Sequence, residues 1–154
     1  MTEGWSLYLD FDGVLNNDPF LRHQKNHVSP EEHRLFDPAN LAAADELIAK
    51  LPVARIIVSS SWRVGRNAAE LAALLASEGL ESSQLVADCT DVMGDREEEI
   101  RAHVLTSGAS NFIVLDDEPL RSFGAHQFFR TPASRGLTRE LVAHILQKSL
   151  RGLP

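Results

Sequence analysis

Acidic residues stand at the ends of two apolar runs, and hydroxyl residues stand at the end of a third. Asp10 and Asp12 follow the first run with one residue between them, 59–61 is a run of three serines, and Asp116 and Asp117 follow the last run. Four carboxylates brought together repel one another and raise one another's pKa, and a divalent cation removes that cost. Hard oxygen ligands suit Mg²⁺, so the sequence predicts a magnesium site if these runs end side by side.

The first acidic pair is suited to phosphoryl transfer. Side chains alternate along a strand, but a bend after Asp10, which Gly13 permits, lets the Asp10 and Asp12 carboxylates approach one site. One carboxylate can attack phosphorus while the other handles the proton of the leaving group. The alternative for the second pair is that it only caps a turn before Pro119. Because three of the apolar runs end in such residues, a shared binding site is favoured over a simple turn cap.

The elements that must position these side chains can be predicted from hydrophobic periodicity. Short apolar runs predict strands at 6–9, 55–58, 85–87, 112–115 and 127–129. Four helices are predicted. The first begins at Asp37-Pro38 and stops at Pro52, and the second runs from 68 to near Gly79. The third runs from 97 to 107, and the last follows a cap at Thr138. Alternating strands and helices predict a three-layer, Rossmann-like α/β fold, with about five parallel strands and helices on both faces. Ligands bind such sheets beyond the carboxyl ends of the strands.

The length and composition predict one domain. The chain has 154 residues, the size of a single domain, so 1–154 is expected to fold as one unit. Residues 16–36 are polar and carry two prolines, which predicts an irregular flap or short insert rather than a cap domain. The formal charge of −7 argues against a broad nucleic-acid footprint, although it leaves room for a local basic pocket for one phosphate.

The expected location is the cytoplasm. Cys89 is the single cysteine, which excludes an intrachain disulfide and fits a reducing compartment. The first residues lack the basic start and apolar run of a signal peptide, and no apolar stretch approaches the ~18 residues of a membrane span. No membrane partner is expected.

Four sequence motifs, in order, resemble those of the haloacid dehalogenase-like (HAD) superfamily. Motif I is similar to 7–15, LYLDFDGVL, and motif II to 56–63, IIVSSSWR. Motif III, a basic residue on a helix, is matched by Arg96, and motif IV by 112–117, FIVLDD. The SSSWR and LDDEP segments further resemble compact, capless HAD domains of RNA-repair fusion proteins.

The resemblance implies a Mg²⁺-dependent phosphohydrolase that works through an aspartyl-phosphate. Asp10 is implied as the nucleophile, and Asp12 as the group that protonates the leaving oxygen and then activates water. The implied metal site consists of the Asp10 carboxylate, the Asp12 backbone carbonyl, Asp117 and the neighbouring Asp116. Dehalogenases of this superfamily lack an aspartate at the Asp12 position, so a phosphoryl substrate is favoured.

The implied phosphate-binding residues leave alternatives open. Ser60 is implied to bind the phosphoryl oxygens, with Ser59 as a rival in the same serine run. Arg96 would neutralise those oxygens, although motif III is usually lysine, and Arg63 is a possible substitute. Trp62 either stacks a base or serves in packing.

The sequence leaves two other functions as alternatives. One is a catalytically silent binding module on the same fold, since fold does not dictate activity. The other is a receiver-like phosphoacceptor domain, for which Asp88 follows the third predicted strand but the expected lysine after the fifth is missing. The expected substrate is a phosphorylated small molecule or polymer end, and a nucleotide or nucleic-acid end is possible.

Overall fold

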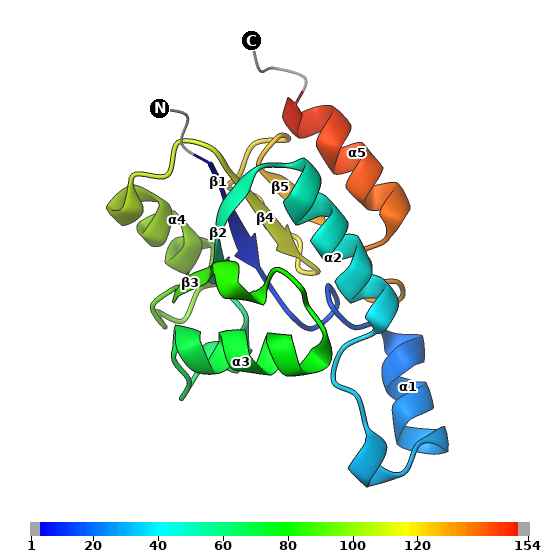
Figure 1. The fold of residues 1–154 in the computed structure, drawn as a ribbon. Helices are drawn as coiled ribbons and strands as arrows, with labels where there is room; N and C mark the ends of the chain where they lie inside the picture. The colour runs from blue at the N-terminus through cyan, green and yellow to red at the C-terminus, as the bar shows by residue number, and fades with distance from the viewer. Residues whose placement is uncertain (1–3, 151–154) are drawn as a thin grey trace.

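The computed structural model describes residues 4–150, and a five-stranded sheet forms its centre. The strands are β1 (Trp5–Leu9), β2 (Val53–Val58), β3 (Val86–Cys89), β4 (Phe112–Asp116) and β5 (Phe128–Arg130). Their order is β3-β2-β1-β4-β5, and every neighbouring pair is parallel (Figure 1). The predicted parallel α/β sheet is therefore confirmed.

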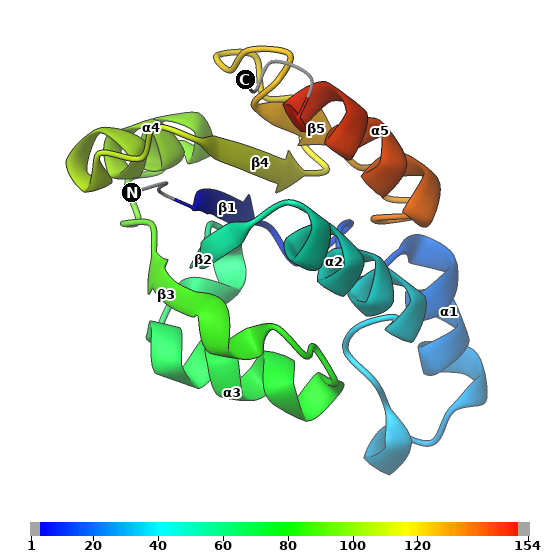
Figure 2. The same cartoon turned by 45° about the horizontal axis from the view of Figure 1, so that its top comes forward.

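Helices cover both faces of the sheet. They are α1 (Asp18–His27), α2 (Pro38–Lys50), α3 (Ala68–Glu78), α4 (Arg96–Ser107) and α5 (Arg139–Leu150), with short 3₁₀ helices η1 (Pro30–Glu32), η2 (Ser61–Arg63) and η3 (Ser83–Leu85). Figure 2 shows α4 on one face, and α2, α3 and α5 on the other. None of the helices in the described range 4–150 is long and apolar enough to span a bilayer.

The core is divided between the two faces of β1. Leu7 and Leu9 belong to the larger apolar cluster, which includes side chains of α2, α3 and α5, whereas Tyr8 belongs to a smaller cluster that includes Ile100 of α4. All residues of β1 are buried. Burial on both faces explains why this strand is a continuous apolar run rather than an alternating one.

Helix ends follow the capping signals in the sequence. The Asp37 side chain accepts a hydrogen bond from the Ala39 amide at 2.9 Å, and Pro38 opens α2. Gly79, in the left-handed conformation that favours glycine, ends α3. Thr138 Oγ1 accepts from the Leu141 amide at 3.2 Å at the start of α5. These predicted boundaries are confirmed.

The expectation of an irregular segment over 16–36 is wrong, because α1 occupies 18–27. Its start carries a normal signal: Asn17 caps the helix by accepting from the Phe20 amide at 2.9 Å, and Pro19 follows in the first turn. The helix buries none of its residues, and apart from Pro19 its apolar side chains are the adjacent Phe20 and Leu21, which do not repeat with a helical period. Figure 1 shows α1 beyond the end of α2, at the carboxyl end of the sheet.

The strand order brings together the chain segments that carry chemistry. β1 lies between β2 and β4, with Leu9 in register with Val58 on one side and with Leu115 on the other. The backbone ladder continues one step further, because the Asp10 amide donates to the Leu115 carbonyl at 3.1 Å and the Ser59 amide donates to the Leu9 carbonyl at 3.1 Å. The ends of these three strands therefore meet at one edge of the sheet.

Candidate active site

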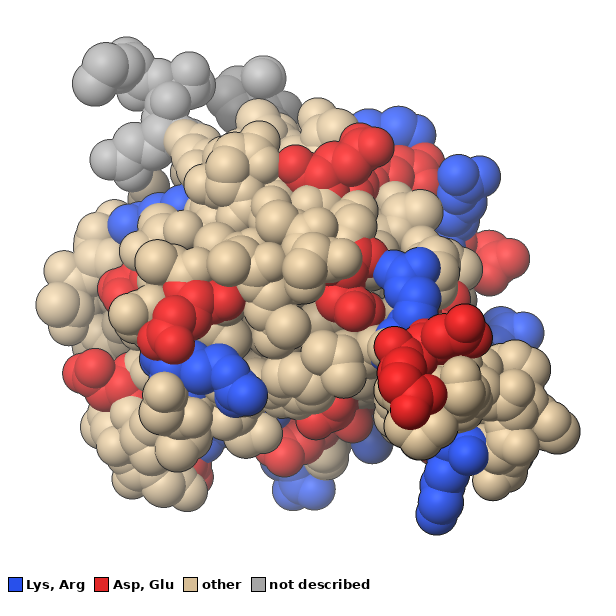
Figure 3. Space-filling view, turned by 60° about the horizontal axis from the view of Figure 1, so that its bottom comes forward, with Lys and Arg blue, Asp and Glu red and all other residues tan. Residues whose placement is uncertain are grey.

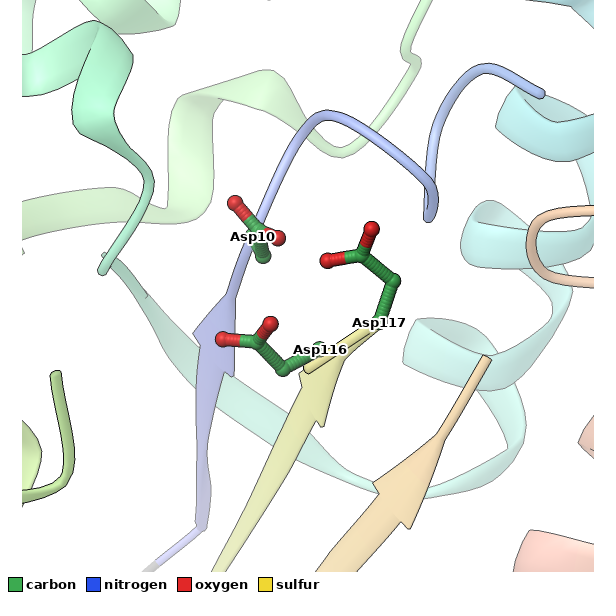
Figure 4. A group of neighbouring side chains, drawn as sticks. All are labelled: Asp10, Asp116 and Asp117. Atoms are coloured by element: carbon green, nitrogen blue, oxygen red, sulfur yellow. The ribbon is translucent and has the colours of Figure 1, made fainter. Parts of the chain in front are cut away.

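Three aspartates gather at this edge. Asp10 directly follows β1, Asp116 ends β4 and Asp117 is the next residue. Each offers a carboxylate oxygen, and these oxygens lie within 4.8 Å of one another. Figure 4 shows the three side chains converging from the tips of the two strands. Asp10 and Asp116 are buried and Asp117 is half-buried.

Gly13 makes room for Asp117. A Cβ built on Gly13 would lie 2.6 Å from Cγ and 2.7 Å from Cβ of Asp117, well inside van der Waals contact. Gly13 also has φ +78°, which side chains rarely adopt. Its carbonyl accepts from Thr131 Oγ1 at 2.6 Å, which fixes the turn after β1 against the segment after β5. The glycine in the DFDGVL motif is thus required by a close approach as well as by the bend.

Arg96 supplies the positive charge of the cluster. It is the first residue of α4, and its Nη1 lies 3.2 Å from Asp10 Oδ2 and 3.0 Å from Asp116 Oδ2. The resemblance implied Arg96 as a partner for phosphoryl oxygens, and in the structure its guanidinium pairs with the two buried carboxylates. A cation in that place can exchange carboxylate partners for phosphate oxygens, since both are anionic oxygen acceptors that a guanidinium can bind through two parallel hydrogen bonds.

One arginine does not balance three carboxylates. Burial raises the pKa of Asp10 most and the charge of Asp116 adds to it, so that the pKa reaches about 8 although Arg96 opposes the shift. Burial likewise raises the pKa of Asp116, in spite of hydrogen bonds from the Glu118 amide and from Arg96. A site in which desolvation outweighs the nearest cation favours binding a further positive charge.

The donor set fits a hard divalent cation. All the ligand atoms that converge are carboxylate oxygens, which Mg²⁺ prefers and which soft metals do not. The residues in position to hold the ion are Asp10, Asp116 and Asp117.

Asp12 lies outside the cluster of three acids and is held by two donors. The Asn16 side-chain amide donates to its Oδ1 at 3.0 Å, and the Trp62 indole N–H donates to its Oδ2 at 2.9 Å. Asp12 is exposed, whereas the intervening Phe11 is fully buried against Phe36. Phe11 thus packs into the core between a buried Asp10 and an exposed Asp12, and the approach of both carboxylates to one site stays a prediction. The carboxylate of Asp12 is not among the metal-ligand atoms that converge.

The serine run does not single out one phosphate-binding residue. Ser59 and Ser60 are both fully buried. Ser60 Oγ caps η2 by accepting from the Trp62 amide at 3.2 Å, which leaves its hydroxyl proton available. Ser59 Oγ has no hydrogen-bond partner among residues 4–150. Ser60 and Ser59 therefore both stay as predictions.

Arg63, the possible substitute for Arg96, makes its contacts away from the three aspartates. It is buried, and it donates from Nε to the Thr90 carbonyl at 2.8 Å and from Nη1 to the Ser60 carbonyl at 2.9 Å. Its Nη2 pairs with Glu99 Oε1 at 2.8 Å, and both side chains are about 95% buried. Arg63 thus joins the ends of β2 and β3 to α4, and Arg96 is the arginine that contacts Asp10.

Sequence reasoning missed several residues that shape this site. Asn16 and Glu99 attracted no prediction, because a buried amide or carboxylate within a polar stretch has no periodic signal. Glu99 Oε2 accepts from the Met93 amide at 2.7 Å, so it orders the loop before α4. Asp88, the residue considered for a receiver-like domain, lies on the edge strand β3 and bonds His103 at 2.7 Å instead of joining the acidic cluster.

The surface around the carboxyl end of the sheet has mixed charge. Figure 3, which looks obliquely toward that end, shows Lys and Arg interspersed with Asp and Glu rather than gathered in one basic patch. A pocket of about 280 Å³ adjoins Arg96 between η2 and the loop before α4, and Val64 and Val92 form part of its lining. The face thus has a pocket beside Arg96 but no broad basic groove.

Comparison with known families agrees with the motifs. A family model described as the HAD domain in Swiss Army Knife RNA repair proteins matches residues 6–142, which is most of the chain. The chain therefore belongs to this family of compact HAD domains. No curated protein and no solved structure matches it significantly.

Proposed function

From this family membership and from the site, we propose that the chain is a Mg²⁺-dependent phosphohydrolase that forms an aspartyl-phosphate on Asp10. The HAD family favours an activity of the hydrolase or phosphatase type. The observation that carries the proposal is the cluster of three carboxylates within 4.8 Å, with Arg96 in contact with two of them. Perturbed carboxylates that converge with a cation in one place are typical of catalytic sites.

Two contacts of Asp10 support its proposed role as the nucleophile. Its Oδ1 accepts from the Phe11 amide at 2.9 Å, which holds the carboxylate, and its Oδ2 faces Arg96. In the first step an oxygen of Asp10 bonds to phosphorus and the bond to the leaving oxygen breaks, while Asp12 gives that oxygen a proton. In the second step Asp12 takes a proton from water as the water oxygen attacks phosphorus, which releases phosphate and restores the Asp10 carboxylate.

The remaining residues stabilise charge on the phosphoryl group. Mg²⁺ bound by Asp10, Asp116 and Asp117 would neutralise carboxylate and phosphoryl charge. Arg96 would turn from the carboxylates to the phosphoryl oxygens. A hydroxyl of Ser60 or Ser59 would donate to a further oxygen, and each can be tested by substitution with alanine.

Hydrolysis of para-nitrophenyl phosphate tests the proposal. The protein should release nitrophenol with Mg²⁺ and stop when a chelator is added, and Asp10→Asn should lower kcat by at least about 1,000-fold, because it removes the nucleophile. Asp18→Asn is the matched control, since Asp18 is an exposed carboxylate at the start of α1. Equal rates for the wild type and Asp10→Asn would refute the proposal, and an inactive wild type across metals and pH values would favour the silent binding module.

We propose further that the substrate is a phosphomonoester at the end of a nucleotide or nucleic acid. The support is the description of the family as a domain of RNA repair proteins and the open pocket beside Arg96. The net charge of −7 and the mixed surface favour recognition of one end rather than of a long duplex. Rates on 3′- and 5′-phosphorylated oligonucleotides, compared with mononucleotides and sugar phosphates, test this; a preference for sugar phosphates would contradict it.

A further inference from the structure

Both carboxylate oxygens of Asp12 are occupied by side chains from different segments. Asn16, four residues along the chain, donates to Oδ1 at 3.0 Å. Trp62 in η2, fifty residues away in the sequence, donates to Oδ2 at 2.9 Å. A carboxylate with one donor on each oxygen is restricted in rotation about its side-chain bonds, since turning it breaks at least one of the two hydrogen bonds.

The Trp62 ring is itself held in place. Its centroid lies 5.9 Å from that of Phe11 and 5.4 Å from that of Phe36, both fully buried, and the Arg66 guanidinium lies 5.9 Å from the ring centroid. The Trp62 backbone amide donates to Ser60 Oγ at 3.2 Å. One residue thus connects the serine run to Asp12, and its indole N–H is already used inside the protein.

The Asn16 side chain is equally constrained. It is about 1% exposed, and its Oδ1 accepts from the Gly13 amide at 2.9 Å. The amide group therefore has a single orientation, with its oxygen on the turn and its nitrogen on Asp12. The loop that follows β1 is in this way tied to the position of the Asp12 carboxylate.

We propose that Trp62 and Asn16 are positioning residues that hold the Asp12 carboxylate where it exchanges a proton with the leaving group and with water. The inference rests on the proposed function, which assigns the proton transfers to Asp12. Proton transfer needs the donor within hydrogen-bond reach of the leaving oxygen, so a freely rotating Asp12 would spend much of its time out of reach. This role adds to the two alternatives, base stacking and packing, that the sequence left open for Trp62.

The dependence of the rate on the leaving group separates this role from general structural damage. An aryl phosphate such as para-nitrophenyl phosphate departs as a stable anion, whereas an alkyl phosphate such as glycerol phosphate needs a proton. Trp62→Phe keeps an aromatic ring against Phe11 and Phe36 but removes the donor. It should lower kcat/KM for the alkyl phosphate about tenfold or more, and that for the aryl phosphate less than about threefold, because general acid catalysis contributes about 100-fold or more in total.

Two further variants complete the kinetic test. Phe36→Leu loosens the same aromatic cluster and leaves the Trp62 donor intact, so it should change kcat/KM for the two substrates by the same factor. Asn16→Asp keeps an acceptor for the Gly13 amide and replaces the donor with a like charge beside Asp12, so it should repeat the selective loss of Trp62→Phe. Equal losses on both substrates in Trp62→Phe would overturn the proposal.

A measurement that needs no activity checks the contact itself. In a nitrogen-15 NMR spectrum, the indole N–H signal of Trp62 should shift in Asp12→Ala, while that of the buried Trp5 serves as an internal reference. An unmoved Trp62 signal would refute the contact and with it the inference. A wild-type protein that hydrolyses neither phosphate although its indole signal responds to Asp12→Ala would refute the proposed function instead.

Discussion

Replacing Gly13 with alanine should damage the acidic cluster beyond the strain it puts on the backbone, and Gly65 allows the two effects to be separated. Both glycines have φ +78°. A Cβ on Gly65 would meet no atom within 4 Å, whereas a Cβ on Gly13 would lie 2.7 Å from Cβ of Asp117. Gly65→Ala therefore reports the conformational cost alone, which is about 1–2 kcal/mol for a left-handed alanine.

Gly13→Ala adds a steric term, because Asp117 Cβ is fixed to its backbone and cannot rotate away. Overpacking of this kind costs about 1–3 kcal/mol, which brings the expected loss to about 2–5 kcal/mol. For a chain of this size each kcal/mol lowers Tm by about 2–4 °C. Displacement of Asp117 should also weaken Mg²⁺ binding, so the rise in Tm on adding Mg²⁺ should shrink in Gly13→Ala and persist in Gly65→Ala.

Differential scanning calorimetry of both variants, with chelator and with Mg²⁺ in excess, measures these quantities. Equal losses of unfolding free energy in the two variants, together with the same response to Mg²⁺ as in the wild type, would refute the reasoning. That result would mean that Asp117 relaxes at no cost and that its carboxylate contributes nothing to holding the ion.

Two further predictions concern buried charge. Glu99→Gln should lower the free energy of unfolding by about 3 kcal/mol in urea titrations, because it leaves the buried Arg63 cation without a counter-charge; a loss below about 1 kcal/mol would show that the carbonyl partners suffice. The raised pKa of Asp10 gives the metal-free native state a proton that the unfolded chain lacks between pH 3.8 and about 8. The contribution of Asp10 to the free energy of unfolding should therefore fall by about 1.4 kcal/mol for each unit of rise in pH across that range. Asp10→Asn should remove this slope from urea titrations at several pH values, and an unchanged slope would contradict the assignment.

The strands and most helix ends were predictable because their causes are local. Ile57 and its neighbours are apolar and β-branched, as a strand buried on both faces requires, and Asp37-Pro38 caps a helix with its own side chain. The acidic residues were predictable as a site for a related reason. Parallel strands end at a common edge, so acids that directly follow Leu9 and Leu115 are brought together once those strands are neighbours.

α1 shows where this reasoning stops. Its cap at Asn17 is local and readable, but the helix buries no side chain, so periodicity could not distinguish it from a polar flap. Surface helices without an apolar face are held by their ends and by contacts such as the hydrogen bond from the Asp18 amide to the Ala133 carbonyl. A contact between residues so distant in sequence leaves no local pattern.

The sequence by itself determined the alternation of strands and helices and the turn at Gly13. It also determined that acidic motifs typical of phosphoryl-transfer sites follow the strands. Only the tertiary structure decided what each charged or polar side chain touches. In the sequence, Arg63 and Arg96 are equivalent as cations. In the structure, Arg63 is buried in an ion pair with Glu99, whereas Arg96 contacts Asp10 in the acidic cluster. The reason is physical: propensity and periodicity act between neighbours along the chain, whereas ion pairs and hydrogen bonds act between whichever groups the packing of the core brings within reach.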